Sequence, residues 1–560
     1  MTTELNVDPN TSSSAKLRSG LFSNRAFVVI LIATSFSGIG LAMFDTGSAW
    51  MMTSLNPSPR LVSAVQVATT LPFFLLTLPA GALTDVVDPR RLLIFADTAV
   101  AVVSIAFAAA VSAGAPGPLT LLATSFLMGM CGALAAPAWL LITQILVPRS
   151  ELDSAIALDT ASYNVARAIG PVFAGYAIAR FSIAVPFWCC CAGNLGLLAA
   201  LIWWRAPRRP KETLPAERLI SAMTTGLRYV RYSREMDATL IRAVAFFPFA
   251  SAYVALLPLV ARSQTGDGAE VYGQLMAAIG VGSIVATLAL KWLKTRLGPN
   301  GQAALGAIGT AVSLFLLAAA REPILALVAS FITGAASIIA LTPFFVSAQV
   351  TLPEWVRGRG LAIFLTVYFG ALTLGSALWG EVATAKGVPF ALSSAGAGAL
   401  IGLALTWRWR LQAGEAQDLT PSMRWRAPCF LNRVANDQGP IMAIIEYAID
   451  PKDSSAFLAI MQDISFERRR DGAYAWHIFE DPIVPGKMIE TYLIHSALEL
   501  KYRQARLTTA DQMIEDGVNQ FLKAPASTRY LVGPQHAPRP SWRKRIGART
   551  LLRRVTRPPP

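Results

Sequence analysis

Three charged residues stand inside long apolar runs of the chain, and their types indicate what chemistry the protein performs. Asp45 lies in the first run, and Asp159 and Arg167 lie eight residues apart in a later run. A charge is costly inside a bilayer, so each is a functional hypothesis. A carboxylate there can gain and lose a proton, and a guanidinium can bind an anion or compensate a carboxylate. Because eight residues span about two helical turns, Asp159 and Arg167 share a similar face, and the sequence predicts proton coupling at these three residues.

Simpler interpretations stand beside that prediction. Asp45 has an alternative position near the outer end of its helix, where water would hydrate it. Asp97 is expected to pair with Arg90, Arg91 or the preceding helix. Arg242 is expected to extend its charge towards the membrane surface.

Polar and aromatic residues in the same runs predict a cavity for a large, partly apolar cargo. The candidates are Gln66, Tyr163, Asn164, Phe247, Tyr253 and Tyr368. Most aromatic residues of membrane helices face lipid or neighbouring helices, so the prediction concerns the group and not any single member.

A charged loop from Gly81 to Arg91 separates two apolar runs. Its candidate gating residues are Gly81, Asp85, Arg90 and Arg91. A glycine lets helices approach, and an aspartate can pair with a cation and hold one conformation shut. The stretch resembles the loop between helices two and three of the major facilitator superfamily, a glycine, three residues, an aspartate and then basic residues around a glycine. The sequence departs from that pattern at Val86, Asp88 and Pro89.

A second motif runs from Gly170-Pro171 to Gly175. Pro171 removes one helical hydrogen bond and the glycines allow tight packing, which predicts a helix kinked against a partner. A plain kinked membrane helix is the alternative. The motif resembles the antiporter motif on helix five of the same superfamily, and that resemblance implies export.

The chain repeats itself at an offset of 205 positions. The matched pairs are Gly129 with Gly334, Gln144 with Gln349, Pro148 with Pro353, Gly170 with Gly375 and Gly175 with Gly380. A repeat of this kind in apolar sequence predicts two homologous membrane halves with a site between them. It adds Gly375 and Gly380 to the candidate gating residues.

Beyond these motifs, the stretch from Val147-Pro148 to Gly170-Pro171 and the C-terminal region resemble a narrower group. That group is the transmembrane secretion effectors, related to the enterobactin exporter and macrolide efflux proteins. The resemblance implies a twelve-helix secondary transporter whose helices one, five, seven and eleven contact the cargo.

The elements that must position these residues are membrane helices. The composition is 54% hydrophobic, which is too apolar for an ordinary soluble protein. Runs long enough to span a bilayer, roughly 20 residues each, lie near 26–51, 61–84, 92–112, 119–147, 154–178, 183–204, 238–260, 271–290, 301–320, 323–350, 358–380 and 389–407. The first run lacks a small-residue cleavage site, so we expect a retained helix.

The formal charge of +15 is distributed as in a membrane protein. If both termini are cytoplasmic, nineteen basic residues fall on inner segments of the membrane region and five on outer loops, which predicts that orientation in the cell inner membrane. Nucleic-acid binding is therefore not predicted. Five cysteines show no zinc or redox spacing, and no Walker-type phosphate loop is present. We expect no metal, no cofactor and no catalytic residue.

After Trp409 the hydropathy falls, and residues 440–533 read as a small soluble domain. Strands are predicted at 441–449, 474–479, 488–494 and 528–532, with helices before 469 and over 497–522. This order predicts a ferredoxin-like domain with helices on one face of an antiparallel sheet. Trp476 and His477 invite comparison with monooxygenase-like ferredoxin folds, but one histidine without a matched acid or nucleophile does not predict catalysis.

We therefore expect an all-α membrane protein of two six-helix halves with a small α+β C-terminal domain. The expected parts are a cytoplasmic tail (1–25), a first half (26–205), a cytoplasmic linker (206–236), a second half (237–410), a ferredoxin-like domain (421–535) and a basic disordered tail (536–560). The predicted function is proton-coupled export of a siderophore, drug or secondary metabolite through the bilayer. Two alternatives remain: a membrane-tethered enzyme or sensor, and homodimerisation through the C-terminal domain.

Overall fold

The computed structural model describes residues 24–412 apart from 84–86, 115, 149–150, 206–218 and 265–267, and residues 419–533 apart from 421, 423–427, 433 and 436–437. Asp85, the aspartate of the first motif, lies outside the described residues. The chain divides into two compact units, before and after position 416.

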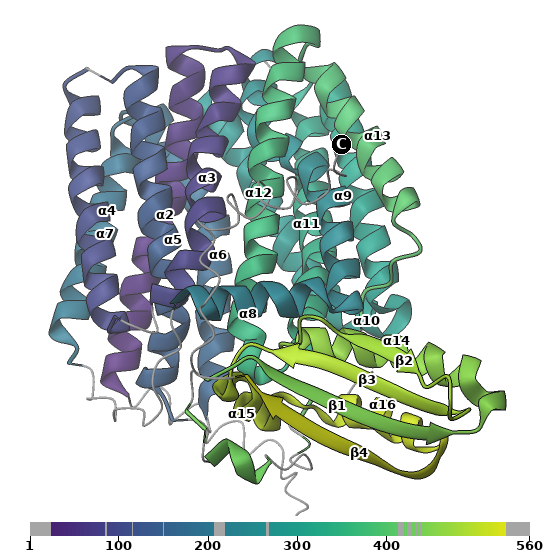
Figure 1. Ribbon diagram of the computed structural model, residues 1–560. Helices are drawn as coiled ribbons and strands as arrows, with labels where there is room; N and C mark the ends of the chain where they lie inside the picture. The colour runs from purple at the N-terminus through teal and green to yellow at the C-terminus, as the bar shows by residue number, and fades with distance from the viewer. Residues whose placement is uncertain are drawn as a thin grey trace, which may run out of the picture. The chain divides into compact units, whose positions relative to one another are not determined.

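The first unit begins with long helices that follow the predicted apolar runs (Figure 1). They are α2 (Arg25–Leu55), α3 (Pro59–Leu83), α4 (Pro89–Ser112), α5 (Pro118–Leu146), α6 (Leu152–Arg180) and α7 (Val185–Trp203). Proline begins or nearly begins four of them, where its missing N–H costs nothing. Asn24 caps α2, because its side chain accepts hydrogen bonds from the amides of Ala26 and Phe27.

A second set of helices follows. It consists of α8 (Leu219–Arg231), α9 (Arg234–Leu259) with a short π-helical extension (Val260–Gln264), α10 (Ala269–Ala319), α11 (Pro323–Val350), α12 (Glu354–Lys386) and α13 (Val388–Leu405). Figure 1 shows α8 lying crosswise at one end of the long helices. We call this end, where α2 begins, the linker end, and the opposite end, where α2 finishes, the far end.

Ten helices of the described chain are long and apolar enough to cross a membrane. The helix α6 is not among them. The ten include α10 as one helix of 51 residues, although Gly298 inside it has a non-helical φ of 61° and precedes Pro299. Glycine accepts this left-handed conformation without strain, so α10 consists of two helical segments that meet at Gly298.

The buried side chains show how the two sets of helices are joined. At the far end one apolar cluster includes Phe44 and Met52 of the first set together with Leu256 and Leu275 of the second. At the linker end the sets have separate clusters, one around Leu93 and Leu201, and the other around Phe344 and Phe364. The halves therefore share a large core at the far end, whereas at the linker end each has its own core and Leu78 of α3 packs against that of the second half.

The glycine pairs of the internal repeat make equivalent contacts in the two sets. A Cβ at Gly129 on α5 would overlap the backbone of α3, and one at Gly334 on α11 would overlap α10. Likewise, a Cβ at Gly170 would contact α2, and one at Gly375 would overlap α9. Because α2, α3 and α5 correspond to α9, α10 and α11, the repeat seen in the sequence is a repeat of helix packing.

The second unit contains a four-stranded antiparallel sheet in the order β2-β3-β1-β4. Its elements are β1 (Ile441–Ile449), α14 (Ser454–Arg470), β2 (His477–Glu480), β3 (Lys487–Ile494), α15 (Ala497–Arg506), α16 (Thr509–Asn519) and β4 (Leu522–Val532). Alternate residues of β1 and β3 are buried and pack with all three helices, so the helices cover one face of the sheet.

Three boundaries in this unit differ from the prediction, and the first is the start of β2, which is His477 and not residue 474. The helix expected over 497–522 is two helices, because Leu507 is extended and the side chains of Thr508 and Asp511 form a capping box that begins α16. The last strand begins at Leu522 and not at residue 528. Pairing with β1 holds this longer strand, although much of it is polar.

Candidate functional site

Asp45 and Arg167 come together from two helices of the first half. Asp45 is in α2 and Arg167 in α6, and the two charges attract each other without a direct ion pair in the described part of the chain. Both side chains are exposed. The helices themselves are in close contact, since a Cβ at Gly170 would lie 2.6 Å from the Cβ of Ala42.

Tyrosine side chains from three helices surround the Arg167 guanidinium. Its carbon lies 5.8 Å from the ring centre of Tyr163, one turn away on α6, which is a cation–π distance. Tyr253 of α9 and Tyr368 of α12 also lie within electrostatic range of Arg167. We call Asp45, Tyr163, Arg167, Tyr253 and Tyr368 the central cluster. Its residues come from both halves, on the four helices expected to contact cargo.

Aromatic contacts hold Tyr368 in place. Phe247 packs edge to face against it with ring centres 4.7 Å apart, and Phe369 adjoins it at 5.0 Å. Phe369 in turn stacks on Phe73 of α3 at 4.6 Å, which links the two halves. Phe247 is only 4% exposed, so it packs against Tyr368 of the central cluster from the buried side. Tyr253 is held by a hydrogen bond of 3.3 Å with the Ser337 hydroxyl.

The other candidates lie at the margin of this cluster. Asp159 is exposed on α6 one turn from Tyr163, and its residue spacing puts it on the same stripe as Arg167. Gln66 and Asn164 are half-buried. Contacts within the described part of the chain do not bring these two side chains to the central cluster, and they remain predictions.

The second motif lies where the two halves meet. A Cβ at Gly175 on α6 would lie 2.8 Å from the Cα of Gly273 on α10. Its repeat partner Gly380 on α12 is in contact with Ser63 on α3. Pro171 lies inside α6, one turn before Gly175. The motif therefore allows helices of opposite halves to approach closely, and its gating role stays a prediction.

Gly81, Arg90 and Arg91 are the described candidates of the first motif, and their gating role stays a prediction. A Cβ at Gly81 would meet no atom within 4 Å, so this glycine does not mediate a close helix approach. Arg90 donates from Nε and Nη2 to the carbonyl oxygens of Leu201 and Ile202, both at 3.0 Å. It thus satisfies the carboxyl end of α7, where a cation is favourable. Arg91 is exposed.

The interpretation of Asp97 as an ion-paired residue is wrong. Its side chain is 6% exposed, and its Oδ2 atom accepts no hydrogen bond in the described part of the chain. Arg90, one expected partner, is engaged at α7 instead. Asp97 lies close to Cys131 of α5, within the first half.

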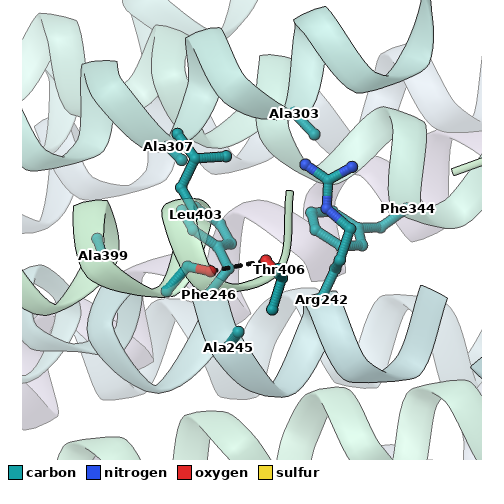
Figure 2. A pocket seen from close by; sticks show the side chains of 10 residues that line it. Arg242, Ala245, Phe246, Ala303, Ala307, Phe344, Ala399, Leu403 and Thr406 are labelled. Atoms are coloured by element: carbon teal, nitrogen blue, oxygen red, sulfur yellow. Dashed lines mark hydrogen bonds between the residues drawn. The ribbon is translucent and has the colours of Figure 1, made fainter. Parts of the chain in front are cut away.

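The interpretation of Arg242 as a side chain that reaches the membrane surface is also wrong. Arg242 is 3% exposed and lines a small cavity with Phe246, Phe344 and Leu403 (Figure 2). Its Nη1 atom donates to Asn300 Oδ1 at 2.6 Å and to the Trp409 carbonyl oxygen at 3.4 Å. The neighbouring carboxyl end of α13 compensates the charge, so Arg242 fastens the chain after the last helix.

Several contacts close the far end between the halves, and sequence reasoning missed most of them. Arg60 of α3 forms an ion pair of 2.8 Å with Glu381 of α12. The hydroxyls of Thr70 and Thr373 are 2.8 Å apart, and Arg262 donates to the Thr53 carbonyl oxygen. The only sequence signal for the ion pair was one basic and one acidic residue near helix ends in a region otherwise poor in charge.

Tyr272 is a further residue that the sequence did not single out. It stacks on Trp50 across the halves with ring centres 5.9 Å apart, and it lies within electrostatic range of Asp45. Its place on α10, one residue before Gly273, brings it to the helix crossing. An aromatic residue beside a glycine gives no such signal locally.

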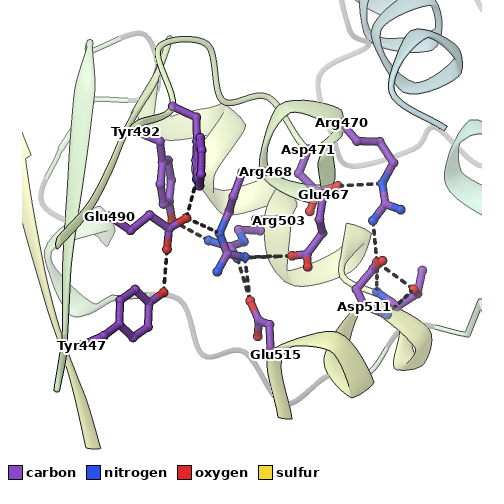
Figure 3. A network of polar contacts seen from close by, with 12 residues as sticks. Tyr447, Glu467, Arg468, Arg470, Asp471, Glu490, Tyr492, Arg503, Asp511 and Glu515 are labelled. Atoms are coloured by element: carbon purple, nitrogen blue, oxygen red, sulfur yellow. Dashed lines mark hydrogen bonds and ion pairs between the residues drawn. The ribbon is translucent and has the colours of Figure 1, made fainter. Parts of the chain in front are cut away.

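Buried ion pairs fill the space between sheet and helices in the second unit (Figure 3). Glu490 of β3 accepts hydrogen bonds from Tyr447 Oη at 2.6 Å, Trp476 Nε1 at 2.8 Å and Arg468 Nε at 3.3 Å. Arg468 also contacts Glu467 and, at 2.6 Å, Glu515. These bonds connect α14 and α16 to the sheet.

His477 is exposed on β2, outside this network, with its ring near Phe479. The described residues contain no group of His, Cys, Asp or Glu side chains that suits a metal ion. The polar groups of the second unit therefore form a structural network, and the described part offers no arranged nucleophile and base.

These findings define a class. The paired sets of apolar helices, joined at one end around a charged cluster, form a transporter fold. The structure resembles a crystal structure of the nucleoside transporter NupG, with a TM-score of 0.56, 12% identity, and 69% of this chain and 100% of that chain covered. The fold is that of the major facilitator superfamily.

Within that class, the chain belongs to the transmembrane secretion effector family, whose model matches residues 18–532. It is 23% identical over 378 residues to the multidrug efflux pump Tap of Mycolicibacterium fortuitum, covering 64% of this chain and 90% of Tap. It is 22% identical to the enterobactin exporter EntS of Shigella boydii, covering 68% of this chain and 91% of EntS. The family consists of membrane transporters and not enzymes.

Proposed function

We propose that the protein is a secondary active transporter that exports a small molecule in exchange for protons. The observation that carries the proposal is the central cluster, where an exposed carboxylate and an exposed guanidinium attract each other among tyrosines from both halves. Charged groups are kept at such depth in a membrane protein when they serve transport. By the names of Tap and EntS, the cargo is a drug, a siderophore or a related secondary metabolite.

The proposed mechanism is alternating access. The halves share a large apolar core at the far end and have mostly separate cores at the linker end, which fits a state open towards the linker end. Closing that end and opening the other requires the far-end contacts to break. Gly175 and Gly380, at crossings between the halves near the far end, are proposed gating contacts that separate when that end opens.

The proposed topology has twelve spans in the cell inner membrane with both termini in the cytoplasm. The ten candidate helices become twelve when α10 is divided at Gly298 and α6 is included. The charge of the inner segments supports this orientation. Cysteine labelling from each side of the membrane tests it, since positions in the 206–218 linker should react only from the cytoplasm.

The proposed second unit is a ferredoxin-like domain. Its order of strands and helices and its β2-β3-β1-β4 sheet fit that layout. A tethered enzyme or sensor is not favoured, because the described part of this unit offers no arranged catalytic groups. Deleting residues 421–560 tests the point: retained transport would count against an enzymatic role. Homodimerisation through this unit stays a prediction, to be tested by the mass of the purified chain.

The experiment for the main proposal is proton movement in everted vesicles challenged with siderophores and lipophilic drugs. The native chain should release protons on addition of a cargo, and Asp45→Asn should abolish the response because it cannot ionise. Asp97→Asn is the matched control, since Asp97 is also an aspartate inside an apolar helix but lies away from the central cluster. Cargo transport that moves no protons in the native chain would contradict the antiport.

A further inference from the structure

The charges inside the apolar helices divide into buried and accessible groups. Those about two turns or more from a helix end are Asp45, Asp97, Asp159, Arg167 and Arg242. Asp97 and Arg242 are 6% and 3% exposed, and Arg242 is fastened to Asn300. The exposed members are two carboxylates, Asp45 and Asp159, and one guanidinium, Arg167.

The guanidinium is already well surrounded. The Tyr163 ring lies 5.8 Å from it, two further phenols lie within electrostatic range, and the Asp45 carboxylate attracts it. An anionic cargo would have to displace these interactions and would meet the repulsion of Asp45. Arg167 is therefore a poor anchor for a negatively charged ligand.

The carboxylates are less well compensated. No basic side chain forms an ion pair with Asp159 or Asp45 in the part of the chain that the structure describes, and one guanidinium stands against two acids. The aromatic rings nearby present their faces to any bound group, and such faces attract cations. Charge balance and the aromatic surroundings both favour a cationic ligand.

We propose that the central cluster and Asp159 bind cargo that carries a positive charge on a bulky apolar body, an amphipathic cation. The inference rests on the proposed transport function and names its substrate class. A proton and a cation compete for the same carboxylates, so cargo leaves when protons arrive, which is the coupling that exchange requires. Once Asp45 is protonated, Arg167 is left uncompensated and repels the cation.

Two ions of nearly equal size and opposite charge test the proposal, tetraphenylphosphonium and tetraphenylborate. Binding to the purified full-length chain in detergent is measured by equilibrium dialysis against protein-free micelles at the same detergent concentration. Tetraphenylphosphonium should bind above the micelle background, and tetraphenylborate should not. Lowering the pH should weaken binding of the cation, because protons neutralise the carboxylates.

Variants assign the effect to residues. Asp45→Asn and Asp159→Asn should each weaken tetraphenylphosphonium binding by about tenfold, and Arg167→Gln should strengthen it. Asp97→Asn is the matched control and should bind as the native chain does. Each variant is first checked for a single symmetric peak in size-exclusion chromatography, and Asp45→Glu should restore binding in part.

Tighter binding of tetraphenylborate by the native chain, lost in Arg167→Gln, would overturn the proposal. So would tetraphenylphosphonium binding that is unchanged in both aspartate variants. The outcome is separable from the transport function. Selective binding of the cation without proton exchange in vesicles would contradict the exchange function and leave the cation site standing. Proton exchange with an anionic cargo would support the exchange function and contradict the cation site.

Discussion

At the scale of single residues, burial gives the carboxylates of the second unit opposite responses to pH. Burial raises the pKa of Glu467 well above its usual range, although Arg468 acts to lower it. Burial also acts to raise the pKa of Glu515, but Arg468 and Arg503 outweigh it and the pKa is lowered. The two groups therefore oppose each other in the pH dependence of stability.

The sign follows from linkage. Glu467, with its raised pKa, contributes stability below the pKa of the unfolded chain, and this is lost as pH rises through the folded pKa. Glu515, with its lowered pKa, contributes stability above the unfolded pKa, and this is lost as pH falls through its folded pKa. Stability of the unit should pass through a maximum at mildly acidic pH.

Glu467→Gln should remove the loss on the alkaline side. Glutamine keeps an oxygen that accepts from Arg468 but does not ionise, so the variant should be more stable than the native chain above neutral pH. The gain grows by about 1.4 kcal/mol for each unit by which the pKa was raised. Hydrogen exchange of β1 and β3 amides in the full-length chain measures it, corrected for intrinsic rates.

Glu480→Gln, on an exposed position of β2, is the control for this variant. It should leave the pH profile unchanged. A Glu467→Gln chain that loses protection at every pH would mean that the negative charge of Glu467 stabilises the network, contrary to the argument.

At the scale of helices, the crossing of α6 and α10 depends on two glycines. Gly175→Val should separate these helices, because even a Cβ would lie 2.8 Å from the Cα of Gly273. Transport should fall by more than about tenfold with insertion retained, since the crossing joins the halves. Gly81→Val is the control, as its position is open. Equal transport by the two variants would show that the crossing is not needed.

Another helix-scale prediction concerns the fastening of the chain after α13. Arg242→Ala removes the hydrogen bond to Asn300 Oδ1 and should destabilise the first unit by about 1–3 kcal/mol. Arg242→Lys, which keeps the charge near the end of α13, should lose less. Thermal unfolding in detergent measures both, with exposed Arg91→Ala as the reference. An alanine variant as stable as the native chain would refute the fastening role.

At the scale of the whole molecule, the halves should move as bodies, and the far-end contacts between them should break during transport. A disulfide in Thr70→Cys/Thr373→Cys joins α3 to α12, where the two native hydroxyls lie 2.8 Å apart. Oxidation should stop transport, and reduction should restore it, because the far end cannot open. Transport is measured in vesicles before and after each treatment.

The matched control is a disulfide within one half. Ser35→Cys/Ser162→Cys joins α2 to α6. The hydroxyls of these two serines are hydrogen-bonded in the native chain. Its oxidation should leave transport intact if each half moves as a body. Loss of transport in this control, or continued transport with the first bond formed, would contradict the proposed motion.

Much of the fold follows from the sequence because its determinants are local. The thickness of the bilayer sets the length of the apolar runs, and proline is favoured at the first helical position. The helices accordingly begin at Pro59, Pro89, Pro118 and Pro323. Strands β1 and β3 alternate buried and open residues, so their positions follow from the sequence, whereas the mostly exposed β4 begins six residues earlier than predicted. The repeat at an offset of 205 positions predicted two homologous halves, and their helices pack alike.

The tertiary structure alone decided which distant residues meet. Asp45 and Arg167 lie far apart in sequence, and only the crossing of α2 and α6 brings their charges together. The same applies to Asp97, which meets none of its expected partners in the described part of the chain, and to Arg242, which was expected at the membrane surface and is held by Asn300. The reason is physical: hydropathy fixes where a helix lies in a bilayer, but its rotation and neighbours depend on side-chain packing summed over many helices.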